Sequence, residues 1–382
     1  MTRVPVRPEL LRWACGRAGY DVRDLESRFP QLRKWERGAK QPTFKQLEAF
    51  ARATHTPFGF LFLPEPPEEP LPIPDLRTVK HRPARPSPDL LDTIYGMQRR
   101  QDWMREERIE GEADPLEFVG NARLNDEPTA VGQEMRRTVA LDDGWAAEVP
   151  SWQEAVGELR RRIEGLGVMA VINGIVGNNT HRKLDVEEFR GFALTDRYAP
   201  FIFVNGADAK SAQMFTLAHE LAHVWLGPEG EGVSGFEGLF PGDSRIEKFC
   251  DQAAAEFLVP ARELKDHWRE VRRTSEPFEQ VARYFKVSPI VAGRRAMDLR
   301  LVSRETFFEF YDAYTKRERR RARTPGGDFY HNQNTRVGEA FATSVIRAAM
   351  GGRLTFKEAY DLTGLRGGAF QEYARRLGMA LP

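Results

Sequence analysis

The chain has 382 residues, with 57 basic and 56 acidic side chains and a formal net charge of +1. Apolar residues make up 41% of the sequence, which is enough for packed cores and excludes a chain that is disordered throughout. The balanced charge argues against a uniformly basic surface that binds nucleic acid. Two cysteines are too few for a disulfide framework. No apolar run approaches the ~18 residues that a membrane-spanning helix needs. We therefore expect a cytoplasmic protein of two or three domains that does not enter a membrane.

Residues 1–63 are predicted to form a small helical unit with apolar side chains at helical spacing. The second helix of this unit is expected to contain Leu25, Phe29 and Leu32. Prolines then become frequent, and proline removes a backbone donor and clashes with a preceding helical turn. Residues 64–88 are therefore predicted to be an extended linker, which is either a flexible spacer or a segment that lies along another domain.

The remainder of the chain predicts an α+β, mainly helical protein with one short sheet. A charged helix is expected to begin at Ser87-Pro88, where serine caps and proline occupies the first helical position, and to end near Glu110. Downstream, the predicted elements are helices at 129–140 and 151–166, strands at 168–172, 189–195 and 201–204, and helices at 209–226 and 246–260. Residues 89–300 are assigned to one domain, and residues 301–382 to a helical C-terminal extension.

The helix at 209–226 contains the pattern H-E-x-x-H, formed by His219, Glu220 and His223. Four residues advance a helix by about 400°, so the two histidines lie about 40° apart on one face and can bind one metal ion. Glu220 lies beside them, where it can reach a water molecule and act as a base. The alternative interpretation is a helix with two ordinary surface histidines.

The third ligand is expected on the following helix, which presents Glu247 and Asp251 one turn apart. We assign Glu247 as a metal ligand and Asp251 as the acceptor for the free ring N–H of a histidine ligand. A solvated helix face is the alternative, and the role of Glu256 on the same helix stays open. Two histidines and one carboxylate leave a fourth position on Zn²⁺ for water, whose pKa falls toward about 7. Glu220 then transfers a proton from water to a leaving amine, which is the chemistry of peptide-bond hydrolysis.

The region from about residue 150 to 265 resembles the ImmA/IrrE-type metallopeptidases. The matching segments are Arg190-Gly191-Phe192-Ala193-Leu194, Pro200-Phe201-Ile202-Phe203-Val204-Asn205, Phe215-Thr216-Leu217-Ala218-His219-Glu220-Leu221-Ala222-His223, and Glu247 with Leu258, Val259 and Pro260. The later helix departs from the family pattern, because Phe249 replaces a second glutamate and Asp251 replaces an asparagine. An aspartate four residues after the third ligand is similar to the thermolysin arrangement. The resemblance implies a zincin-like core and a zinc peptidase activity.

A donor that stabilises the transition-state oxyanion opposite the metal is also expected. Tyr198 and His181 are candidates for this role. For each of them, a structural or exposed position without a part in the reaction is the alternative.

The N-terminal unit resembles a Cro/repressor-type helix-turn-helix through residues 32–38 and the segment after it. Phe29-Pro30-Gln31 stands where that family places the turn and the groove-reading start of the recognition helix. This shortening favours protein contact, or a degenerate structural remnant, over DNA binding.

Two functions fit these features. The first is an intracellular regulatory zinc endopeptidase that cleaves a specific protein partner, such as a repressor or an antitoxin. The second is a non-proteolytic antitoxin or transcriptional regulator that binds DNA or a toxin and retains a metal site with a structural role. The family resemblance implies that such a toxin would be a PIN-like ribonuclease. A glutamate at the base position, Glu220, favours the enzyme, because a structural metal needs no base.

Overall fold

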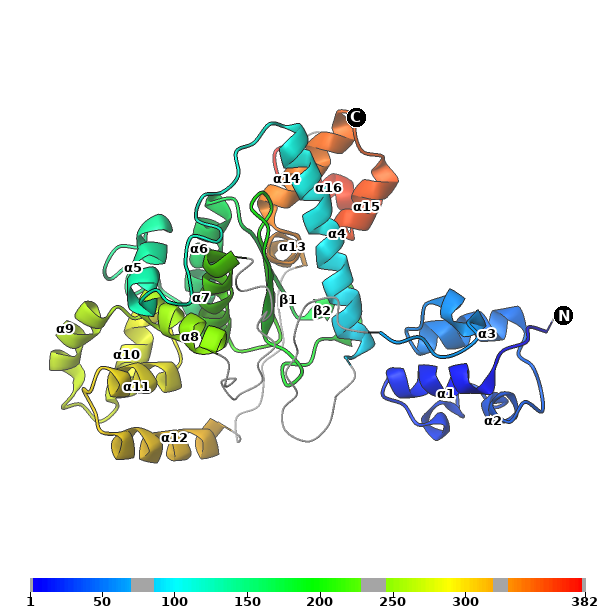
Figure 1. Ribbon diagram of the computed structural model, residues 1–382, viewed down its shortest axis with the longest axis horizontal. Coiled ribbons are helices and arrows are strands. Elements are labelled where there is room, and N and C mark those ends of the chain that lie inside the picture. Colours follow the sequence, from blue (N-terminus) through cyan, green and yellow to red (C-terminus); the bar gives the residue numbers. More distant parts are fainter. Residues whose placement is uncertain (1–2, 70–85, 228–244, 319–328, 380–382) are drawn as a thin grey trace. The chain divides into compact units, whose positions relative to one another are not determined.

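A computed structural model describes residues 3–69, 86–227, 245–318 and 329–379 (Figure 1). The described residues form two compact units, one up to Tyr95 and one from Gly96 onward, and helix α4 (Pro88–Glu110) begins in the first and ends in the second. Most of the predicted linker, residues 64–88, lies outside the described residues, and the domain boundaries stay predictions. Within the described ranges, no helix combines the length and the apolar character needed to cross a membrane.

The first unit contains helices around a small aromatic core that includes Trp35 and Phe50, both buried. Its elements are α1 (Pro8–Arg17), a 3₁₀ turn η1 (Val22–Leu25), α2 (Leu32–Glu36), α3 (Phe44–Ala53) and a second 3₁₀ turn η2 (Phe58–Phe62). The predicted helix through Leu25 and Leu32 was wrong, because the chain leaves helical conformation between η1 and α2, where Pro30 lacks a backbone donor.

The second unit is built on a three-stranded sheet with the order β1-β5-β4. Strand β1 (Met169–Asn173) pairs in parallel with β5 (Phe201–Asn205), and β4 (Gly191–Leu194) pairs antiparallel with β5. Every residue of the three strands is buried, as expected for short apolar runs covered on both faces. These strands confirm the three predicted ones.

A short hairpin of β2 (Ile175–Val176) and β3 (Asn179–Lys183) was not predicted. Strand β3 reads Asn-Thr-His-Arg-Lys and is mostly exposed, so it has no apolar run or apolar alternation to reveal it.

Helices surround the sheet, and the predicted mainly helical α+β class is confirmed (Figure 1). Helices α6 (Trp152–Gly165) and α7 (Lys210–Leu226) pack beside the strands, and α8 (Arg245–Leu258) packs on α7 and on α5 (Pro128–Thr138). The other helices are α9 (Ala261–Val271), α10 (Pro277–Phe285), α11 (Pro289–Asp298), α12 (Arg304–Glu318), α13 (Phe329–Val337), α14 (Glu339–Met350), α15 (Phe356–Thr363) and α16 (Gly368–Arg376).

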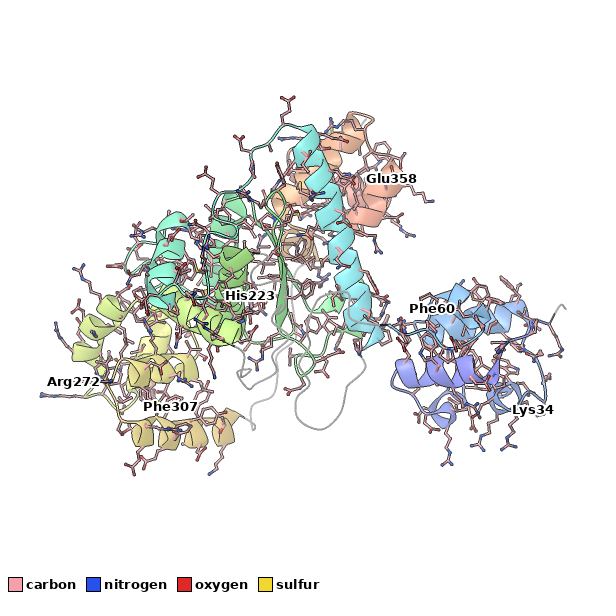
Figure 2. All side chains as sticks on the ribbon, in the orientation of Figure 1. Lys34, Phe60, His223, Arg272, Phe307 and Glu358 are labelled. Carbon is pink, nitrogen blue, oxygen red and sulfur yellow. The ribbon has the colours of Figure 1, made fainter. Side chains whose placement is uncertain are left out.

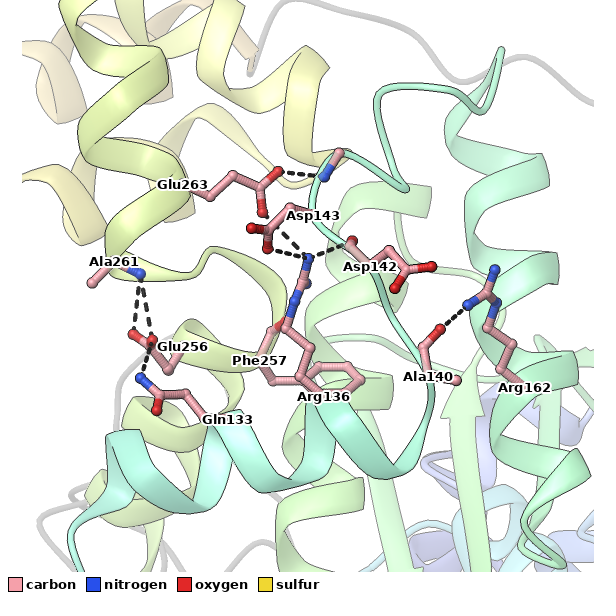
Figure 3. Close-up of polar contacts among 11 residues, drawn as sticks. Gln133, Arg136, Ala140, Asp142, Asp143, Arg162, Glu256, Phe257, Ala261 and Glu263 are labelled. Carbon is pink, nitrogen blue, oxygen red and sulfur yellow. Dashed lines mark hydrogen bonds and ion pairs between the residues drawn. The ribbon is translucent and has the colours of Figure 1, made fainter.

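Polar contacts join α8 to its neighbours, and Figure 3 shows Glu256 of α8 accepting hydrogen bonds from Gln133 on α5 and from the backbone N–H of Ala261. Glu256, whose role the sequence left open, is 2% exposed and pairs with Arg295 on α11. Nearby, Arg136 on α5 lies 3.2 Å from Glu263 on α9, and Glu263 accepts a 2.7 Å hydrogen bond from the backbone N–H of Gly144. Buried charges are tolerated only when they are paired, so the Glu256–Arg295 contact holds α8, the helix that carries Glu247, against α11.

Candidate metal site

The two histidines of the H-E-x-x-H pattern lie on α7, which is buried on nearly all sides between the sheet and α8. His219 is 9% exposed and His223, labelled in Figure 2, is 3% exposed. Glu247, in the first turn of α8, is 0% exposed. The apolar residues around the pattern therefore bury the helix and hold its two imidazoles in fixed positions.

The side-chain atoms of His219, His223 and Glu247 converge on one point. His219 Nε2 lies 3.2 Å from His223 Nε2 and 3.0 Å from Glu247 Oε2, and His223 Nε2 lies 3.4 Å from Glu247 Oε1. The three potential ligand atoms all lie within 4.8 Å of one another. The structure thus brings together the three side chains that the sequence assigned to one site.

These spacings suit a small tetrahedral cation. Zn–N and Zn–O distances of about 2.0–2.1 Å place two ligand atoms of a tetrahedral site about 3.3 Å apart. Two imidazole nitrogens that lie 3.2 Å apart, both beside the buried carboxylate of Glu247, form a donor set that zinc prefers. The residues present therefore fit a zinc ion bound by two histidines and one glutamate.

Asp251 lies on the outer side of this cluster, one turn after Glu247 on α8. Its Oδ1 is 3.0 Å from His219 Nδ1. Burial opposes the charged imidazolium of His219, but hydrogen bonds with Asp251 and Glu247 outweigh it and raise the pKa of His219 well above its usual value. A proton on Nδ1 that is donated to Asp251 leaves Nε2 with the lone pair that a metal ligand requires.

Glu220 is 1% exposed and lies beside the same cluster. Burial raises the pKa of its carboxyl group to about 8, the nearby His219 lowers it, and the negative charge of Glu247 raises it further. Its Oε2 has no hydrogen-bond partner among the residues that the structure describes. Glu220 therefore has one oxygen free to exchange a proton with a molecule that enters the site.

In the sequence, Gly191 stands out only as part of a family motif, whereas the structure shows why a larger residue does not fit there. Strand β4 approaches α7 so closely that a Cβ atom at Gly191 would lie 2.5 Å from Thr216 Cγ2 and 2.8 Å from the carbonyl oxygen of Phe203. It would also lie 3.1 Å from Glu220 Oε1. A glycine at the start of a buried strand is a recognisable signal for close backbone approach, but the sequence does not say what approaches it.

Neither of the two candidates for the oxyanion donor is hydrogen-bonded to this cluster among the described residues. His181 is exposed on β3, and Tyr198 lies in the turn between β4 and β5, where its carbonyl oxygen accepts a hydrogen bond from Arg108. Within the described residues, neither side chain forms a hydrogen bond or an ion pair with His219, Glu220, His223 or Glu247.

Comparison with protein families is consistent with this site. Residues 177–297 match the family model of the IrrE N-terminal-like domain, Peptidase_M78, and this region contains every residue of the cluster. The match supports the resemblance to ImmA/IrrE-type metallopeptidases over that domain. Residues 337–376 match a second model, a domain of unknown function named DUF8813. No curated protein matches the chain.

Proposed function

We propose that the chain is a regulatory zinc endopeptidase that hydrolyses a peptide bond in a specific protein partner, such as a repressor or an antitoxin. The convergence of His219, His223 and Glu247 beside a buried glutamate is the observation that carries this proposal. The peptidase family model over the same residues supports it.

In the proposed reaction, His219, His223 and Glu247 would hold the ion. Zinc in such a site polarises a substrate carbonyl, lowers the pKa of water and, through its charge, favours the ionised form of a neighbouring carboxyl group. Glu220 accepts a proton from the attacking water on Oε2 and donates it to the nitrogen of the leaving amine. Asp251 keeps His219 in the tautomer and orientation that the site needs.

Glu220 also distinguishes between the two candidate functions, a peptidase and a non-proteolytic antitoxin or regulator with a structural metal. A buried, unpaired carboxyl group costs stability, because desolvation opposes its charged form. A site that only stabilised the fold would gain from an apolar or hydrogen-bonded residue at this position. The presence of Glu220 therefore favours catalysis.

The test is co-expression of the chain with a candidate repressor or antitoxin, followed by mass spectrometry of that candidate protein. The wild type is expected to cut it once, and Glu220→Gln is expected to reduce cleavage by a factor of about 10²–10⁴ while keeping the metal. Glu154→Gln, an exposed change on α6, is the matched control and should cleave normally. If Glu220→Gln forms a stable complex and the wild type leaves the partner intact, the binding function is correct instead.

A further inference from the structure

A cavity lies at the opposite end of α7 from His223. This cavity, of about 480 Å³, opens at the first residue of this helix, at the carboxyl ends of the parallel strands β1 and β5. Its walls come from α6, the β2–β3 hairpin and α13 as well. In open sheets with parallel strands, the crevice beyond the carboxyl ends of the strands is a common place for ligands.

All charged side chains that line this cavity are positive. They come from four separate elements: Arg160 on α6, Lys183 on β3, Lys210 on α7 and Arg336 on α13. No acidic residue is among the described residues that line it. Like charges that converge from distant parts of the chain are unfavourable unless an anion is bound between them.

Three of these cations have no carboxylate partner among the residues that the structure describes. Within the described part of the chain, Lys183, Lys210 and Arg336 form no ion pair. Among the described residues, the ammonium group of Lys210 donates only to the neutral side chain of Gln213, at 3.1 Å.

Arg160 is the most deeply placed of the four, at 4% exposed. Its Nη1 donates a hydrogen bond to Glu164 at 2.5 Å. Its Nε–H has no hydrogen-bond partner among the described residues. A buried donor without a partner in the wall of a cavity indicates a polar ligand that supplies the acceptor.

The backbone adds to this attraction. Helix α7 has 17 residues, and its N-cap residue, Ala209, provides no side-chain hydrogen bond to the first turn. The N–H groups at the start of such a helix, together with the positive end of its dipole, favour a bound anion.

We propose that this cavity binds a small phosphorylated molecule, with its phosphate group between Lys183, Lys210 and Arg336 at the start of α7. A phosphate monoester carries close to two negative charges, so it balances three cations better than a single carboxylate does. The volume exceeds that of a phosphate ion and falls within the range of small-molecule sites, which leaves room for an organic group. The ligand would connect α13 to the helix that carries His219 and His223. This proposal does not depend on peptidase activity.

Isothermal titration calorimetry of the full chain at low ionic strength tests it, with inorganic phosphate and glycerol 3-phosphate as probes. We expect saturable binding of one anion per chain, and we expect Lys210→Ala and Arg336→Ala each to weaken it by about tenfold or more, since each removes a charge-assisted contact. Lys265→Ala, an exposed lysine on α9, is the matched control and should bind like the wild type. Thermal unfolding without anion verifies that each variant is folded.

The titration is repeated with Glu247→Gln, because phosphate can also bind to a metal. Unchanged binding in this variant is expected, and loss of binding would place the anion at the metal site and overturn the proposal. We expect glycerol 3-phosphate to bind more tightly than phosphate, because its organic group contacts the rest of the cavity. Equal or weaker binding of glycerol 3-phosphate would overturn the assignment to a phosphorylated organic molecule. Absence of saturable binding, or equal affinity in Lys210→Ala, Arg336→Ala and Lys265→Ala, would also overturn it.

Discussion

His219 and Asp251 lie on different helices, and their side chains meet with Nδ1 3.0 Å from Oδ1. This contact connects α8 to α7 on the side of the imidazole that faces away from Glu247. It makes Asp251 a positioning residue, which acts on the metal only through His219.

Asp251→Ala should therefore weaken zinc binding by about 10–100-fold without removing a ligand. Competition with a chromogenic chelator measures this affinity. Gln252→Ala, an exposed change at the next position of α8, provides the control. Equal zinc affinity in Asp251→Ala and the wild type would show that the contact does not orient His219.

Gly191→Ala should destabilise the second unit by about 1–3 kcal/mol, the range of overpacked cores. The new methyl group would overlap Thr216 and the backbone of Phe203, so β4 and α7 must separate and Glu220 must move. Urea unfolding measures the loss. Gly165→Ala at the end of α6 meets no atom within 4 Å and should leave the free energy of unfolding unchanged or slightly higher. Equal stability of the two variants would contradict the close approach.

The raised pKa of Glu164 predicts that the stability of the fold depends on pH, independently of the metal site. Burial raises the pKa of its carboxyl group to about 7, Arg160 opposes the shift, and Glu339 adds to it. The folded pKa is above the unfolded value near 4.5, so the folded state holds its proton more tightly. The contribution of Glu164 to stability is therefore fully present below about pH 4.5 and is lost as the pH rises to about 7.

Chemical unfolding of the wild type and of Glu164→Gln between pH 5 and 8 measures this effect. As the pH rises, the wild type should lose a few kcal/mol of unfolding free energy relative to Glu164→Gln. One pKa unit corresponds to about 1.4 kcal/mol. Glu154→Gln, on the exposed face of the same helix, should show no such trend. A constant difference for Glu164→Gln would mean that its carboxyl group is ionised throughout this range.

The sequence predicted best those helices and strands whose own residues show a clear hydrophobic pattern. The apolar run at 168–172 and the periodicity of 209–226 predicted β1 and α7 to within a few residues. His219 and His223 could be placed together because helix geometry alone determines their relation. Glu247 was predicted because a third ligand was expected on the following helix, but only the folded chain shows how close it lies to His219.

Features that depend on distant segments could not be predicted. Arg295, which pairs with Glu256, lies on another helix, 39 residues later in the chain. The cationic side chains of the cavity at the start of α7 come from four elements that are far apart in the sequence, so no local sequence pattern reveals the cavity. The exposed β3 strand has no apolar alternation, and Pro30 interrupts a helix that spacing alone favoured.

The most direct measurement is the zinc content of the purified chain, determined by inductively coupled plasma mass spectrometry after purification without chelators. We predict about one zinc per chain in the wild type and in Gln252→Ala, and a loss of most of that zinc in Glu247→Gln. A wild type that contains no zinc, or a Glu247→Gln variant that keeps as much as the wild type, would contradict the proposed coordination of one ion by His219, His223 and Glu247.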